Sequence, residues 1–403
     1  MEKLRVRAYN VGFGDAIFIS VPDSTADGER KTRHILIDVG SVKEKKVDGE
    51  GELYIESVIR NIVEVLDGKP LDLYIMTHEH MDHVKGLYYS AKELEPPLEL
   101  KVQYAWLTAS AEDGYYDRHE GVRQKLAEVQ DMFKRVEAFT SVLQASDGKL
   151  PAGINSMLLN NNPRKTKPCV DYLQELATER TTYIHRGCDL NGTHPFREVT
   201  FDVWAPEEIT TEYYGRFRPM NLNFIPLSRN GTGAEGSSKK IPASHPKPPK
   251  DVDPEGFKKL VESLGSGYID NLLAIDKAAN NTSIVFCLNW RGWKLLFAGD
   301  AEVRSWKTMG KHNVIEPVHF FKISHHGSIN GMPPPRFLDV MFPGDSYDGR
   351  EPKALLTSYK GVYNNVPDDT VTKILEERGV KVHSLSEGAA LGNYIDIDFP
   401  AIE

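Results

Sequence analysis

Thr77-His78-Glu79-His80-Met81-Asp82-His83 is the stretch on which the fold and the chemistry of this chain depend. Positions 78 to 83 hold three of the 13 histidines of the 403-residue chain, together with two carboxylates. The stretch directly follows Leu71–Met76, a short apolar run that predicts a buried strand. Imidazole nitrogens and carboxylate oxygens at the end of a rigid strand suit zinc, and also iron or manganese where carboxylates are plentiful. A polar loop with neighbouring histidines is the plainer alternative, and the density of the cluster speaks against it.

Composition limits the class of protein. Hydrophobic residues make up 40% of the chain, which is enough for a sizeable core, and the net charge of −9 argues against a surface that binds nucleic acid everywhere. A local basic groove remains compatible with that charge. The three cysteines, Cys169, Cys188 and Cys287, are widely spaced and form no CxxC pair, which favours a reducing compartment. With no apolar leader or long apolar run in the sequence, we expect a cytoplasmic protein that does not span a membrane.

The pattern along the chain predicts a layered α/β domain with an insertion. Residues 1–107 show a β-hairpin, a strand containing Asp38, a helix and the strand before the histidines. Residues 108–197 are charged with helical apolar spacing and predict a mainly helical insertion. Residues 198–403 return to strands, with a flexible loop rich in proline and lysine at about 228–255.

Polar groups also end three apolar runs in the second half. Asn280-Asn281-Thr282-Ser283 precedes one predicted strand, Gly299-Asp300 ends the next, and His325-His326-Gly327-Ser328 ends a third. A Gly-Asp pair alone is a common turn. In this order after His-x-His-x-Asp-His, the three together indicate the second half of one site.

His-x-His-x-Asp-His resembles the signature of the metallo-β-lactamase superfamily. The opening Val11-Gly12-Phe13-Gly14-Asp15 is similar to that of the soluble hydrolase domain of ComEC-type DNA-uptake proteins and their free-standing relatives. The resemblance covers roughly residues 4–107 and 198–398. It implies a four-layer αββα metallo-β-lactamase-like sandwich with a helical insertion.

The resemblance also implies a set of metal ligands. His78 and His80 correspond to the ligands of metal one, and Asp82 and His83 to those of metal two. Asp300 corresponds to the carboxylate that bridges both metals. One of His325 and His326 would complete metal two, and the sequence does not decide which.

Further positions have supporting roles or depart from the family pattern. Asp38 corresponds to the carboxylate that orients a metal-binding histidine from behind. Asn281 is expected either to support the site or to form a strand-entry turn, and Asp15 either to approach the site or to cap a turn. The usual third histidine of metal one would fall near Ala279 to Asn281, where the chain has none, and Val366 stands where relatives often place a histidine before proline.

This ligand set predicts a metal-dependent hydrolase. Two divalent ions, zinc with manganese as the alternative, would activate a hydroxide, with Asp82 and Asp300 as the carboxylates at the reacting centre. The resemblance favours a phosphodiesterase or nuclease acting on nucleic acid or a nucleotide. The alternatives are an ester, lactone or amide hydrolase on the same site, and a metal-stabilised binding module with little activity. The sequence identifies no protein partner.

Overall fold

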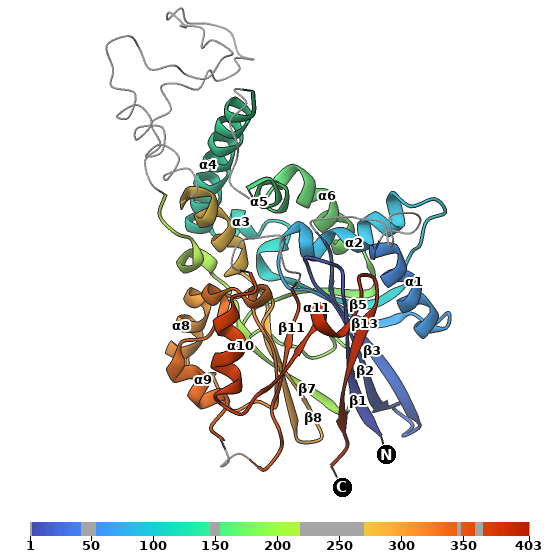
Figure 1. Cartoon of the computed structure of the whole chain (residues 1–403). Coiled ribbons are helices and arrows are strands. Elements are labelled where there is room, and N and C mark those ends of the chain that lie inside the picture. Colours follow the sequence, from blue (N-terminus) through green and yellow to red (C-terminus); the bar gives the residue numbers. More distant parts are fainter. Residues whose placement is uncertain are drawn as a thin grey trace, which may run out of the picture.

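The computed structural model describes residues 2–41, 54–145, 154–217, 270–344, 348–358 and 366–402. Two β-sheets lie face to face, and helices cover the outer face of each (Figure 1). This confirms the α/β class and the αββα order, and it is consistent with the metallo-β-lactamase-like sandwich. The expected loop at about 228–255 lies outside the described residues.

The first sheet has seven strands in the order β13-β1-β2-β3-β4-β5-β6. Their bounds are β1 Lys3–Tyr9, β2 Ala16–Ser24, β3 Arg30–Val39, β4 Leu71–Met76, β5 Val102–Thr108, β6 Ala177–Ile184 and β13 Tyr394–Pro400. The neighbours from β13 to β3 pair antiparallel, and those from β3 to β6 pair parallel. The hairpin predicted near the N-terminus is the β1–β2 pair.

The second sheet has six strands in the order β12-β11-β10-β9-β8-β7. Their bounds are β7 Val199–Ala205, β8 Val285–Trp290, β9 Trp293–Phe297, β10 Phe320–Lys322, β11 Lys353–Leu356 and β12 Lys381–Ser384. Strands β9 to β12 pair parallel, and β7, β8 and β9 pair antiparallel. Because the parallel strands of one sheet end at the same edge, residues that follow β3 and β4, or β9 and β10, come together.

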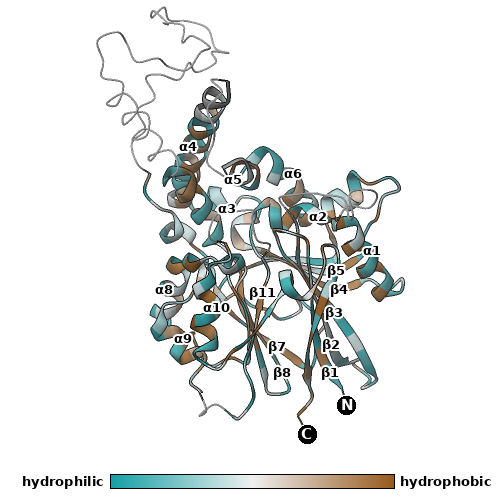
Figure 2. Ribbon diagram, viewed as in Figure 1, coloured by the Kyte–Doolittle hydropathy of each residue, from teal (hydrophilic) through white to brown (hydrophobic). Residues whose placement is uncertain are grey.

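Because successive side chains of a strand point to opposite faces of the sheet, the core forms separate layers between the sheets and under the helices. Leu4, Val6 and Ala8 of β1 point into the space between the sheets, where they join side chains such as Phe286 and Phe297 of the second sheet. Apolar residues on the opposite faces of the strands, such as Phe18 and Tyr74 of the first sheet and Leu296 of the second, pack under the helices. Figure 2 shows hydrophobic residues on the strands and on the helices packed against them.

Three groups of helices complete the described structure. The first sheet is covered by α1 (Tyr54–Leu66), α2 (Met81–Lys92) and α6 (Pro163–Gln174), and the second by α8 (Val303–Lys311), α9 (Pro335–Met341) and α10 (Asp369–Glu376). The remaining helices are α3 (Tyr115–Arg118), α4 (Glu120–Ala145), α5 (Ile154–Asn160), α11 (Leu385–Gly388) and residues 270–280. Phe133 and Val136 of α4 pack on Leu272 and Ile275. Within the described chain, no helix has the length and apolar character that a bilayer crossing requires.

The range 108–197 is not helical throughout. The expected helical character ends before the range does, because α6 ends at Gln174, and Ala177–Ile184 forms β6 at the edge of the first sheet. Its pattern was missed because an edge strand is half solvated, and Glu179, Arg180 and Thr181 remove the apolar alternation. The division of the chain into two halves and an insertion stays a prediction.

Two glycines let the backbone of the first sheet approach the histidine stretch closely. A Cβ at Gly40 would overlap backbone atoms of Asp82 and His83, and one at Gly14 (φ +147°) would overlap Gly40 and Asp82. Asp15 N also donates to the Asp82 carbonyl at 3.1 Å. Residues 77–83, called the metal loop below, are therefore held by backbone contacts that leave no room for a side chain.

We expect Gly40→Ala to destabilise the protein by about 1–3 kcal/mol, because backbone cannot move aside as a flexible side chain can. Urea unfolding monitored by circular dichroism measures this. Gly121→Ala in α4 is the control, since a Cβ there meets only Thr211 Oγ1 at 3.8 Å. An unchanged urea midpoint for Gly40→Ala would show that the loop is not held in this way.

Candidate metal centre

The candidate site lies where the parallel strands of both sheets end. Strand β4 ends at Met76, the chain bends at Glu79, and α2 begins at Met81 after the extended residue His80, which places Asp82 and His83 in the first helical turn. Asp82 also suits this position because the N-terminal end of a helix carries partial positive charge. Asp300 follows β9, and His326 follows β10 in a short 3₁₀ turn, His325–Gly327.

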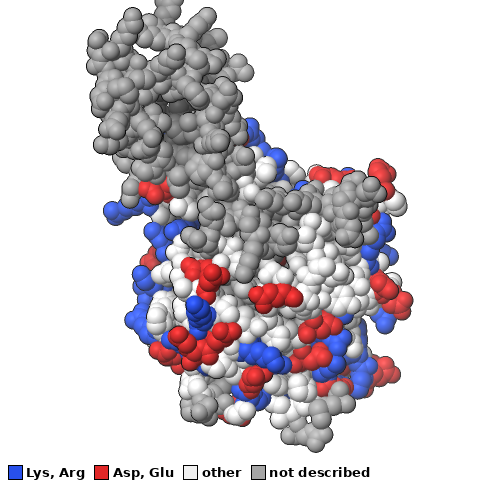
Figure 3. All heavy atoms as spheres, in the orientation of Figure 1, with Lys and Arg blue, Asp and Glu red and all other residues white. Residues whose placement is uncertain are grey.

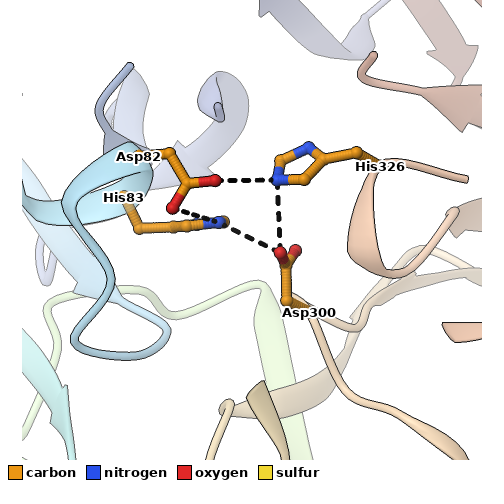
Figure 4. Close-up of side chains that lie close together, drawn as sticks. All are labelled: Asp82, His83, Asp300 and His326. Atoms are coloured by element: carbon orange, nitrogen blue, oxygen red, sulfur yellow. Dashed lines mark ion pairs between the residues drawn. The ribbon is translucent and has the colours of Figure 1, made fainter. Parts of the chain in front are cut away.

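Asp82, His83, Asp300 and His326 form one compact group, called the four-residue cluster below (Figure 4). His83 Nε2 lies 3.8 Å from Asp82 Oδ1 and 3.4 Å from Asp300 Oδ2. His326 Nε2 lies 3.3 Å from Asp82 Oδ2 and 3.2 Å from Asp300 Oδ2. One ligand atom from each residue lies within 4.8 Å of all the others, and all four side chains are buried.

Three polar atoms of this cluster form no hydrogen bond and are suited to bind a metal ion. Asp82 Oδ1, His83 Nε2 and His326 Nε2 are buried without a hydrogen-bond partner, which is costly unless a ligand satisfies them. The opposite ring nitrogens are occupied, because His83 Nδ1 lies 2.8 Å from Asp38 Oδ2 and His326 Nδ1 lies 2.8 Å from the Thr357 carbonyl. Both imidazoles are thereby oriented with Nε2 toward the cluster, which is how metal-binding histidines are commonly held.

Charges compensate one another inside the cluster. Burial by itself lowers the pKa of His326, but the carboxylates of Asp300 and Asp15 outweigh it and raise the pKa to about 10. Burial also lowers the pKa of His83, but Asp300, Asp82 and Asp38 raise it by more. The pKa of His83 therefore lies well above the usual range. Burial favours a neutral Asp300, yet His326, His83 and Lys322 hold its pKa well below normal. Two imidazolium groups thus occupy the electrostatic role that a divalent cation would take.

Asp38 lies behind the cluster, fully buried at the end of β3 with φ +50°. Its Oδ1 accepts from Thr77 N at 2.8 Å, and its Oδ2 accepts from Thr77 Oγ1 at 2.6 Å and contacts His83. The structure therefore places Asp38 behind the ring of His83, whereas the sequence resemblance had not specified which histidine it would contact.

His78 and His80 lie beside the four-residue cluster and outside it. His78 Nε2 and His80 Nδ1 face each other at 3.0 Å, and the rings of His78 and His83 have centroids 4.1 Å apart. Two nitrogens bound to one zinc at about 2.0–2.1 Å stand at a comparable separation. Burial and the neighbouring His83 hold the pKa of His78 well below its usual value, which leaves a neutral imidazole.

The structure separates the two histidines of the 325–326 pair. His326 joins the four-residue cluster, whereas His325 Nδ1 lies 3.4 Å from Glu302 Oε1 in a different group of side chains. Asn281 does not reach the four-residue cluster in the described structure. Its Nδ2 donates to the Lys277 carbonyl at 2.7 Å, and its Oδ1 accepts from Ser305 at 3.1 Å, which ties residues 270–280 to α8.

Lys322 is a site residue that sequence reasoning missed. It is 1% exposed at the end of β10, with Nζ 2.5 Å from Asp15 Oδ2, 3.4 Å from Asp300 Oδ1 and 3.0 Å from the Gly299 carbonyl. Asp15 therefore approaches the site, and its other oxygen lies 3.6 Å from His326 Nδ1. A lysine in the apolar run before His325 was the available signal, since buried lysines need a charged partner.

Two asparagines of the helical segment also hold the metal loop. Asn160 Oδ1 accepts from the Asp82 backbone N–H at 3.1 Å. Asn161 Oδ1 lies 2.9 Å from His80 Nε2, and Asn161 Nδ2 donates to Asp276 Oδ1 at 2.7 Å. The run Asn160-Asn161-Asn162 was visible in the sequence as a polar stretch, but the partners of Asn160 and Asn161 in the metal loop and at Asp276 are 78 to 115 residues away.

No family model matches the sequence, and no curated protein matches it. The comparison with solved structures finds the crystal structure of a long form RNase Z from yeast, at 12% sequence identity and a TM-score of 0.34. The match covers 98% of this chain and 41% of that chain, so this chain spans under half the length of the yeast protein. At this score the likeness decides nothing about activity, and the proposals below rest on the site itself.

Metal binding should release protons. His83 and His326 hold protons at neutral pH, and Nε2 of each must lose its proton before it binds a metal. Because the free protein binds more protons than the complex, affinity should rise with pH across the neutral range up to about 10, the pKa of His326. Calorimetric titration with Zn²⁺ in two buffers of different ionisation enthalpy measures the number released. Binding without proton release would contradict the assignment of these two rings.

Asn161→Ala should weaken metal binding about 10- to 100-fold, because His80 loses the acceptor that orients its ring. Competition with a chromophoric chelator gives the dissociation constant. Asn162→Ala is a matched control, since Asn162 caps α6 through Arg164 N at 3.0 Å and, among the described residues, forms no hydrogen bond with His80. Equal affinities in the two variants would show that Asn161 does not orient His80.

Proposed function

We propose that this chain is a metal-dependent hydrolase of the metallo-β-lactamase superfamily, resembling the ComEC-type group, and that it cleaves a phosphodiester in nucleic acid or a nucleotide. The observation that carries the proposal is the convergence of three buried atoms that form no hydrogen bond, Asp82 Oδ1, His83 Nε2 and His326 Nε2, beside Asp300 Oδ2. Such a set suits zinc or manganese.

In this proposal two ions are bound. His78 Nε2 and His80 Nδ1 would hold one, Asp82, His83 and His326 the other, and Asp300 Oδ2 would serve both. When bound, such ions act as Lewis acids on the phosphoryl oxygens and lower the pKa of water to about 7.

The protein's own groups would position and compensate these ligands. Asp38 and the Thr357 carbonyl fix the rings of His83 and His326, and Lys322 occupies Asp300 Oδ1 so that Oδ2 faces the cluster. All four side chains of the cluster are buried, which strengthens the electrostatic interactions in the site.

Charge at the surface bears on the size of the substrate. On the face in Figure 3, basic and acidic side chains of the described residues are interspersed. An extended basic surface is what long duplexes require. The described residues of this face do not form such a surface.

A second candidate, hydrolysis of an ester or amide, is favoured by a cavity of about 110 Å³ next to His80. Leu126, Val129 and Phe133 of α4 and Ile275 line it, while Glu79 and Ser110, hydrogen-bonded at 3.1 Å, provide its polar wall. An apolar acyl group would fit such a lining as well as a nucleobase would.

We expect Asp300→Asn to lower turnover of bis-p-nitrophenyl phosphate by roughly a hundredfold or more, because the variant loses the carboxylate shared by both ions. The screen includes single-stranded DNA, duplex DNA, RNA and p-nitrophenyl butyrate, with Zn²⁺ or Mn²⁺ added. Asp339→Asn is the control, since Asp339 is 64% exposed and pairs with Arg378 on the surface. Undiminished turnover in Asp300→Asn would refute the proposed role. Preference for the butyrate ester would favour the second candidate.

A further inference from the structure

A second group of ligand-type side chains lies beside the metal loop. Asp276, Glu302 and His325 each offer an atom within 4.8 Å of the other two, and they are called the second cluster below. Asp276 belongs to the helix at 270–280, Glu302 precedes α8, and His325 follows β10. Only His325 had been singled out from the sequence, and none of the three belongs to the four-residue cluster.

The two carboxylates of the second cluster are poorly compensated. Glu302 is 4% exposed and Asp276 is 9% exposed, so both have lost most of their contact with water. Within the described chain, neither forms an ion pair with a lysine or arginine. The imidazole nitrogens beside them are His325 Nδ1, 3.4 Å from Glu302 Oε1, and His80 Nε2, 4.0 Å from Asp276 Oδ1, and Lys277 is near enough to lower the pKa of Glu302. Two carboxylates buried together without a fixed cation repel each other unless a proton or a metal ion joins them.

The side chain of Asn280 points into the middle of this group and is itself fully buried. Its Nδ2 lies 3.0 Å from Glu302 Oε1, 3.3 Å from Asp276 Oδ2 and 3.3 Å from His325 Nε2. Its Oδ1 is buried without a hydrogen bond, and so is His325 Nδ1. A half-turn of the amide would place Oδ1 among the two carboxylates and the imidazole. Only a cation makes that arrangement of acceptors favourable.

We propose that Asp276, Asn280, Glu302 and His325 form a second divalent-cation site, distinct from the four-residue cluster. Two carboxylates, an amide oxygen and an imidazole nitrogen make an oxygen-rich donor set that suits Mn²⁺. The site goes beyond the proposed hydrolase function and does not depend on it.

The path of the backbone explains how adjacent histidines serve different sites. His325 and His326 both have φ +50°, a left-handed conformation that is uncommon outside glycine. Their ring centroids lie 6.3 Å apart, and one ring faces Glu302 while the other faces Asp300. The second site also connects to the metal loop, because Asp276 accepts from Asn161, whose other end contacts His80.

Metal stoichiometry tests the proposal on the full-length protein, stripped with chelator and titrated with Mn²⁺ under electron paramagnetic resonance. We expect Glu302→Gln to bind one equivalent less than the unaltered protein, and Asp300→Asn to retain that equivalent. His325→Asn, at a partly exposed position, gives the same reading if Glu302→Gln does not fold. Melting curves of each variant establish that it is folded.

The proposal is overturned if folded Glu302→Gln or His325→Asn binds Mn²⁺ in the same number and with the same affinity as the unaltered protein. It is also overturned if Asp300→Asn abolishes all Mn²⁺ binding, because the second site then does not exist separately. Loss of the equivalent in Glu302→Gln supports the site even if no substrate is hydrolysed, so this result and the fate of the hydrolase proposal are distinguishable.

Discussion

This structure depends on one constraint: its buried carboxylates must be neutralised by other side chains, because water does not reach them. Asp15, Asp38, Asp82 and Asp300 are all 0–1% exposed, and Lys322, His83 and His326 are buried among them. Moving such groups out of water costs several kcal/mol per ion unless their partners are fixed in place. The fold supplies that fixation by ending strands of both sheets at one edge, so each carboxylate meets a cation or an imidazole.

The same interactions join the two halves of the sandwich. Asp15 lies between β1 and β2 of the first sheet, whereas Lys322 belongs to β10 of the second, and their ion pair is closed to solvent. The backbone adds to this link, since Ile284 N donates to the Thr77 carbonyl at 2.9 Å. The apolar core between the sheets brings these halves together without specifying a register. Polar contacts at the edge then define how they meet.

Much of this arrangement could be read from the sequence, because some of its signals are local. The strand before His78, the hairpin at the start and the Gly-Asp and His-His ends of β9 and β10 are contiguous patterns, and the structure has strands or turns at each of them. The partners of Asn161, Asp276 and Glu302 could not be predicted, since each depends on contacts between distant segments. The sequence also could not show which of His325 and His326 joins the four-residue cluster, because two left-handed backbone conformations direct the rings to different neighbours.

The hold of Asn160 and Asn161 on the metal loop limits how this chain can be shortened or recombined. Their segment resembles a detachable module in sequence, since it interrupts a pattern that continues on both sides. Removing it would leave the Asp82 amide and one nitrogen of His80 without their acceptors. A minimal domain made by excising the segment would therefore need replacement groups at these two points, and a chimaera with a foreign insertion would have to provide them in the same positions.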